Sequence, residues 1–334
     1  MQQKYPSLTN RFSWVYTFLC LALVSGLFTD AWAHSHIPEF IETFFTPWHA
    51  LLYGAYLAVF IFLLYHWRQN LKKGYPWKKA LPKGYGLSLL GGLIFFFGGF
   101  GDMLWHTFIG IEENIDALYS PSHLALIVGG ALIFTAAARS WLHQKQRSKL
   151  PAILSMTLFY ILLTFFSQFY SPFIIPYITV SEKPVDIPAL DPHSLAAKEL
   201  SGYNLPMAGF IIHSAILVAV VLYMLRKMKL PGGFTIMFTI ATAYGAIILD
   251  QYRFIPAAML TGFILDTYAG TASRHPRWTG LVLPIVLYSL YYITIFLTDA
   301  VWSTMHYWLG SILIAGSTGY LVSLLFQDDH FPTP

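Results

Sequence analysis

The sequence predicts an all-α polytopic membrane protein with about ten transmembrane helices. Composition is the first observation: of 334 residues, 56% are hydrophobic and 11% are charged, with a mean hydropathy of +0.56. These values are typical of helices that face lipid. We expect a single membrane domain over residues 1–334, because the longest extramembrane segment, 171–204, is too short to form a second domain.

Ten apolar runs are the second observation. Each is long enough to cross, or nearly cross, roughly 30 Å of hydrocarbon. The runs lie near 12–33, 47–66, 85–108, 122–140, 151–170, 205–225, 233–250, 254–269, 279–298 and 301–326. The run at 254–269 is the shortest of them.

The third observation is an internal repeat in the first four helices. Asp30 and His34 are four residues apart, and so are Asp102 and His106. Residues with this spacing share one face of a helix. The two copies predict a repeated helical hairpin, at 12–66 and at 85–140.

Each copy continues with a helix start and a second histidine. A hydroxyl residue followed by proline is a typical N-cap and first helical position. These residues are Thr46 and Pro47 before His49, and Ser120 and Pro121 before His123. Each hairpin should therefore carry Asp and His at the end of one helix and His at the beginning of the next.

These residue types indicate a metal site. Ionisable side chains within membrane helices are costly and usually mark function. The predicted ligands are Asp30, His34, His49, Asp102, His106 and His123. Cys20 is the single cysteine and the nine methionines form no cluster at this face, so imidazole and carboxylate are the available ligands, which suit iron, manganese, zinc or Cu(II). Two alternatives remain open: the repeat serves architecture, or it forms a proton-handling network.

Further residues are candidates around this site. Glu112 and Glu113 lie between the two histidines of the second copy and are candidate catalytic bases. Four residues of later helices are expected on the same side of the membrane and are candidates to line the site: His213, Asp250, Asp299 and His306.

Charge distribution predicts the orientation. Of the 20 Lys and Arg residues, 17 fall on alternate loops that the positive-inside rule makes cytoplasmic, whereas 13 of the 16 acids fall on the other side. Both termini are then cytoplasmic, and the metal candidates and loop 171–204 face the periplasm or exterior of a bacterial-type inner membrane. Ala31 to Ala33 also fit a signal-peptide cleavage site, which would make His34 the first residue. An uncleaved first helix is the preferred interpretation.

Asp102, His106 and His123 also resemble the metal motif in the third subunit of copper membrane monooxygenases, the methane and ammonia oxidisers. The match covers about 22 residues. The resemblance implies that these three residues bind a metal at the outer part of the bilayer, and it favours copper or iron over zinc.

Three function classes follow from these patterns. The preferred one is a membrane metalloenzyme, an oxidoreductase on an apolar or small substrate or else a hydrolase. The alternatives are a transporter or metal-handling permease, and an assembly or scaffold subunit of a membrane complex. The polar residues gather at one membrane face, and Asp266 is the only charged residue expected on the inner half of the membrane. A path across the membrane would then be incomplete, so an enzyme is favoured over a transporter. The basic loops are expected to contact lipid heads and not nucleic acid.

Overall fold

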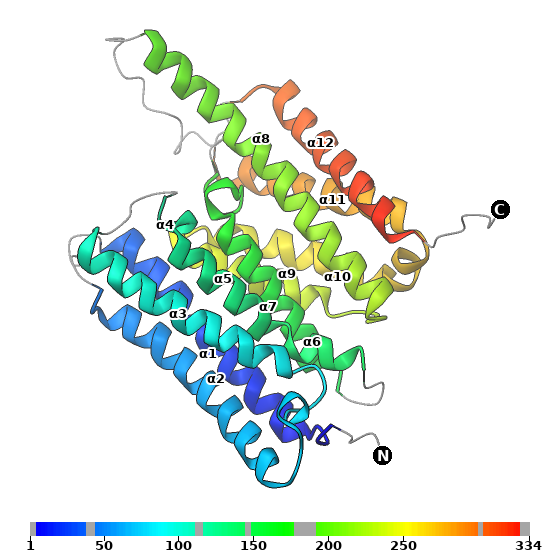
Figure 1. The fold of residues 1–334 in the computed structure, drawn as a ribbon. Coiled ribbons are helices and arrows are strands. Elements are labelled where there is room, and N and C mark those ends of the chain that lie inside the picture. Colours follow the sequence, from blue (N-terminus) through cyan, green and yellow to red (C-terminus); the bar gives the residue numbers. More distant parts are fainter. Residues whose placement is uncertain are drawn as a thin grey trace, which may run out of the picture. The chain divides into compact units, whose positions relative to one another are not determined.

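The computed structural model describes residues 5–37, 44–110, 116–143, 148–176, 192–299 and 303–327, with backbone alone at 116–117 and 192–205. These residues form helices joined by turns, with no strand among them (Figure 1). The all-α prediction is therefore confirmed for this part of the chain. The chain divides into two compact units, Met1–Leu162 (unit 1) and Leu163–Pro334 (unit 2). The expectation of one membrane domain stays a prediction.

Unit 1 contains two long helical hairpins, which occupy the predicted ranges 12–66 and 85–140. In the first hairpin α1 (Asn10–His36) packs on α2 (Pro47–Lys72), and in the second α3 (Gly86–Phe108) packs on α5 (Pro121–Phe134). A 3-10 turn at Trp77–Lys79 lies between the hairpins, α4 (Asp116–Tyr119) precedes α5, and α6 (Ala136–Trp141) follows it. The boundary with unit 2 falls within α7 (Leu150–Phe166).

Unit 2 is also helical. Its principal helices are α8 (Pro192–Leu222), continued by a π-helical turn at Tyr223–Lys227, then α9 (Phe234–Leu249), α10 (Ile255–Arg274), α11 (Pro276–Thr298) and α12 (Met305–Ser323). Short 3-10 turns are found at Gln168–Tyr170, Tyr252–Phe254 and Leu324–Phe326. Its core is an aromatic cluster in which Phe210, Phe254, Tyr288, Tyr291 and Tyr292 are at most 2% exposed.

Helix length and hydropathy identify an integral membrane protein. Among the described residues, seven helices are long and apolar enough to cross a membrane. Helical segments overlap all ten predicted apolar runs, but α7 and α9, at 17 and 16 residues, are shorter apolar helices, and α10 is not among the seven. The count of ten crossings therefore stays a prediction.

The segment 171–204, predicted as a loop, is helical from Pro192 onward. Residues 177–191 lie outside the described part, but α8 begins at Pro192, thirteen residues before the apolar run that starts at 205. The segment from 192 to 204 begins with proline, which is favoured at a first helical position, and it contains Leu, Ala, Lys and Glu, which have high helix propensity. Local propensity therefore extends the helix beyond its apolar part.

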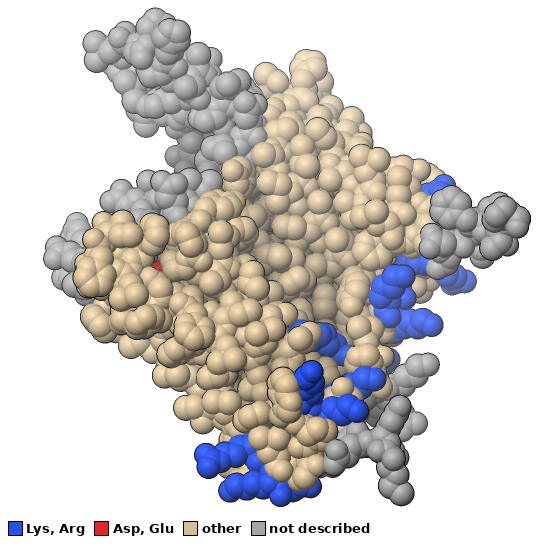
Figure 2. Space-filling view, viewed as in Figure 1, with Lys and Arg blue, Asp and Glu red and all other residues tan. Residues whose placement is uncertain are grey.

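Basic residues and the predicted metal ligands lie at opposite ends of unit 1. Arg68 lies near the end of α2, and Lys residues follow it in the connection to α3. Lys and Arg side chains group at this end of the unit (Figure 2). His49 begins α2 and lies nineteen residues before Arg68, which corresponds to roughly 28 Å along a helix. The charge segregation seen in the sequence is thus kept within this unit.

Candidate metal centre

The N-caps of α2 and α5 hold two of the predicted ligands in the same way. The Thr46 hydroxyl accepts a hydrogen bond from the backbone N–H of His49 (3.1 Å) and lies 3.0 Å from Nδ1 of the same ring. Ser120 does the same at His123, with distances of 3.4 Å and 2.7 Å. A hydroxyl oxygen has two lone pairs, so it can accept from both the amide and an Nδ1–H. That tautomer leaves Nε2 free to coordinate a metal.

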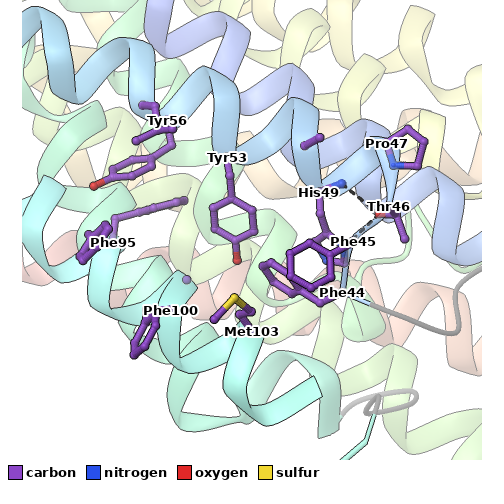
Figure 3. A pocket seen from close by; sticks show the side chains of 14 residues that line it. Phe44, Phe45, Thr46, Pro47, His49, Tyr53, Tyr56, Phe95, Phe100 and Met103 are labelled. Atoms are coloured by element: carbon purple, nitrogen blue, oxygen red, sulfur yellow. Dashed lines mark hydrogen bonds between the residues drawn. The ribbon is translucent and has the colours of Figure 1, made fainter. Parts of the chain in front are cut away.

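Each of these rings meets a carboxylate from the neighbouring helix. In the first hairpin, Asp30 Oδ2 lies 3.9 Å from His34 Nε2 and 3.7 Å from His49 Nε2. In the second hairpin, Asp102 Oδ1 lies 3.3 Å from His106 Nε2 and 3.5 Å from His123 Nε2. Figure 3 shows His49 at the start of α2, with a dashed line to Thr46.

The two hairpins bring these groups to one place in unit 1. Ring centroids of His34 and His49 are 6.0 Å apart, those of His49 and His106 are 6.0 Å apart, and those of His106 and His123 are 6.3 Å apart. All six predicted ligands are therefore gathered in one cluster. Two three-residue sets within it have ligand atoms within 4.8 Å of one another: Asp30, His34 and His49, and His49, Asp102 and His106.

One of the two carboxylates is deeply buried. Asp102 is 1% exposed, whereas the Asp30 side chain is 13% exposed. Oδ1 of Asp30 is a buried oxygen that accepts no hydrogen bond from the described residues. In Asp102, Oδ1 faces the His106 and His123 rings and Oδ2 accepts a hydrogen bond from the Tyr53 hydroxyl (2.9 Å). A buried charged oxygen without a hydrogen bond is costly, and a bound cation would compensate it. The donor set therefore fits a transition metal.

Matching glycines bring the two helices of each hairpin together. A Cβ on Gly26 would lie 2.8 Å from Cα of Leu52, and a Cβ on Gly98 would lie 3.0 Å from the backbone N of Leu126. In both hairpins the glycine lies four residues before the Asp of the first helix, and the leucine lies three residues after the His at the start of the second helix. Only a residue without a side chain allows this approach, so the same contact places Asp next to His in both hairpins.

An apolar cavity of about 550 Å³ adjoins the cluster between α2 and α3. His49 and Tyr53 line it together with Phe44, Phe95 and Met103 (Figure 3). Leu57, Phe96 and Phe100 also line it and are 46%, 47% and 50% exposed. The helices α2 and α3 that carry these residues are long and apolar enough to cross a membrane, and the exposed side of the cavity is apolar.

Several other predicted site residues are not placed in the cluster. Glu112 and Glu113 lie outside the described residues, so their catalytic role stays a prediction. The four predicted lining residues belong to unit 2. There His213 is 5% exposed and contacts Ser167 through Nε2, at 3.2 Å from both its carbonyl and hydroxyl oxygens.

The remaining three lining candidates lie near helix ends of unit 2. Asp299 pairs with Arg253 (3.2 Å), and Asp250 ends α9 in a left-handed conformation with φ of 56°. His306 is exposed in the first turn of α12. The contacts of Asp299 and His213 explain these residues as parts of unit 2, and their role as site lining stays a prediction.

Tyr53 is a site residue that the sequence reasoning missed. It follows His49 by four residues and so shares its helix face, which is the signal that could have identified it. Its hydroxyl joins the first hairpin to the carboxylate of the second. The backbone of Gly99 leaves room for the ring, since a Cβ there would collide with Tyr53 Cε1.

Comparison of the chain with protein-family models, curated proteins and solved structures found no match. The resemblance to the copper monooxygenase subunit therefore stays a prediction.

Proposed function

We propose that this protein is a membrane metalloenzyme, an oxidoreductase whose site faces the periplasm or exterior and acts on an apolar substrate. One observation carries the proposal: four imidazoles direct Nε2 at two carboxylates, and one of these rings, His49, forms part of the wall of an apolar cavity. The structural elements of a binding site for metal and for an apolar molecule thus occur side by side in unit 1.

The distances between ligand atoms support metal binding. Ligands at about 2.0–2.2 Å from one tetrahedral ion are themselves about 3.3–3.6 Å apart. The four nitrogen–oxygen separations of 3.3–3.9 Å lie close to this range. Imidazole and carboxylate ligands suit copper or iron, and open coordination positions on such ions support redox chemistry.

The repeat and the topology belong to the same proposal. The matched caps and the matched glycine contacts support a duplicated hairpin unit. Ten crossings with both termini cytoplasmic would place every acid of the cluster on the outer side and the Lys and Arg loops on the inner side.

A contact of Asp266 bears on the transporter alternative. Its two carboxylate oxygens accept hydrogen bonds from the backbone amides of Gly233, Phe234 and Thr235, at 2.8–2.9 Å. These amides begin α9, where the helix dipole favours an anion. Asp266, the acid on the inner half, thus caps α9. This structural role favours an enzyme over a translocation path.

The test compares metal content and stability in the purified full chain. His106→Ala should lower the metal content with a modest loss of melting temperature, because water can fill the space near the membrane surface. His36→Ala is the matched control, since His36 lies exposed at the same end of α1 with Nδ1 3.0 Å from the Trp32 carbonyl. Unchanged metal content with a collapsed melting temperature in His106→Ala would support a scaffold instead.

Activity is tested separately. The copper- or iron-loaded protein, supplied with oxygen and a chemical reductant, should convert an alkyl substrate into an oxidised product detectable by mass spectrometry. The His106→Ala variant should give none. Metal binding without any product would leave a metal-handling protein as the better conclusion.

A further inference from the structure

Each hairpin contributes one carboxylate and two imidazoles near it, and those of the first hairpin have ligand atoms within 4.8 Å of one another. This set has a carboxylate and an imidazole one helical turn apart, and a second imidazole from the first turn of the partner helix. It comprises Asp30, His34 and His49 in the first hairpin and Asp102, His106 and His123 in the second. Two imidazoles and one carboxylate form a known metal triad that leaves coordination positions open.

We propose that the chain binds two metal ions, one on each hairpin, as a dinuclear centre. The proposal rests on the metal site of the proposed function and gives its number of ions and their ligands. His49 lies between the two positions, because its ligand atom is within 4.8 Å of those of Asp30 and His34 and also of those of Asp102 and His106. The two ions would therefore be neighbours.

Charge supports two ions. Asp30 and Asp102 are two acids within one cluster of partly or fully buried rings, and the charged residues of the α2–α3 connection lie at the other end of unit 1. Two buried carboxylates repel each other unless cations are present. In each hairpin one carboxylate oxygen is near both rings, so each acid can compensate one ion.

The two positions differ in exposure and in their hydrogen bonds. The His34 side chain is 38% exposed, whereas that of His106 is 6% exposed. Tyr53 of the first hairpin donates to Oδ2 of Asp102 in the second, which leaves Oδ1 directed at the two rings. We therefore expect the ion of the first hairpin to exchange with solvent and to be removed by chelators before the ion of the second.

The experiment counts ions on the full chain in detergent. Chelator-treated protein is titrated with Cu(II), freed of excess metal, and analysed for copper per chain by atomic emission. The expected value is two for the wild type. It is one for His34→Ala and one for His123→Ala, and it stays two for the control His36→Ala. Electron paramagnetic resonance should show spin–spin interaction in the wild type and isolated Cu(II) in both single-site variants.

Each outcome decides the proposal. One copper per wild-type chain, lost in both variants, would overturn the dinuclear centre and leave a single-ion enzyme standing. Two coppers without spin–spin interaction would place the ions in separate sites and overturn it as well. Absence of copper binding by the wild type would overturn the proposed function too. The wild-type count decides even if a variant fails to fold.

Discussion

Asp102 has neighbours of three kinds: two imidazoles, a phenol and the glycine-rich backbone of its own helix. It is 1% exposed, so the surroundings and not water determine what its charge costs. Breaking a buried ion pair by removal of one partner typically costs about 3–5 kcal/mol. Substitutions around this residue should therefore separate its role in folding from its role in binding.

Tyr53→Phe removes the hydroxyl that joins the first hairpin to the Asp102 carboxylate of the second. A hydrogen bond to a charged group is worth about 1.5–3 kcal/mol, so unfolding should become easier by up to this amount. Because outer hydrogen bonds orient metal ligands, affinity at the second hairpin should fall about 10–100-fold. Chemical denaturation and metal titration provide the two measurements.

Tyr56→Phe is the control for this substitution. Tyr56 lies on the same helix and lines the same cavity, but its hydroxyl donates to the backbone carbonyl of Gly92 (2.7 Å). This variant should lose stability and keep its metal affinity. Equal losses of affinity in both variants would contradict the role assigned to Tyr53.

At the scale of the element, the start of α5 performs two tasks. The Ser120 hydroxyl caps the helix and holds the ring of His123. Ser120→Ala should lower the free energy of unfolding by about 0.5–2 kcal/mol, the usual loss of an N-cap. It should also weaken metal binding, whereas Ser120→Thr should restore both. Thermal denaturation and copper titration test this, and weakened stability with unchanged affinity would limit the hydroxyl to capping.

The approach of α3 to α5 gives a second prediction about elements. Gly98→Ala places a methyl group 3.0 Å from the backbone of Leu126, and overpacking of this kind costs about 1–3 kcal/mol. Gly101→Ala is the matched control on the same helix, since its Cβ would meet its nearest neighbour at an ordinary 3.9 Å. A melting temperature that falls for Gly98→Ala alone would agree with the helix contact.

Local patterns allowed the sequence to predict helices, caps and the Asp–His spacing, because each depends on residues a few positions apart. The cap residues Thr46 and Ser120 were predicted as helix starts, but their contacts with Nδ1 depend on ring orientation. Tyr53 and the cavity depend on how α2 lies against α3, a contact between residues about fifty positions apart. No local pattern encodes such a pairing.

On the scale of the whole molecule, membrane orientation is the prediction on which the site depends. Single cysteines introduced in a Cys20→Ala background at Ser35, Asn114 and Ser181 should react with an impermeant reagent added from outside, and one at Ser148 should not. The reason is the charge asymmetry of the loops. Labelling of cells and of inverted vesicles provides the measurement, and a reversed pattern would place the site on the cytoplasmic side.

The mouth of the cavity has a consequence for kinetics. Under the proposed function, a molecule that reaches His49 and Tyr53 past the exposed Leu57, Phe96 and Phe100 would arrive from the hydrocarbon phase and not from the aqueous phase. Its effective concentration is then the number of moles of substrate per mole of lipid. The reaction rate would therefore saturate with the mole fraction of substrate in the bilayer. Addition of empty lipid vesicles or micelles at constant protein and substrate should lower the rate by surface dilution, and an unchanged rate would point to entry from water.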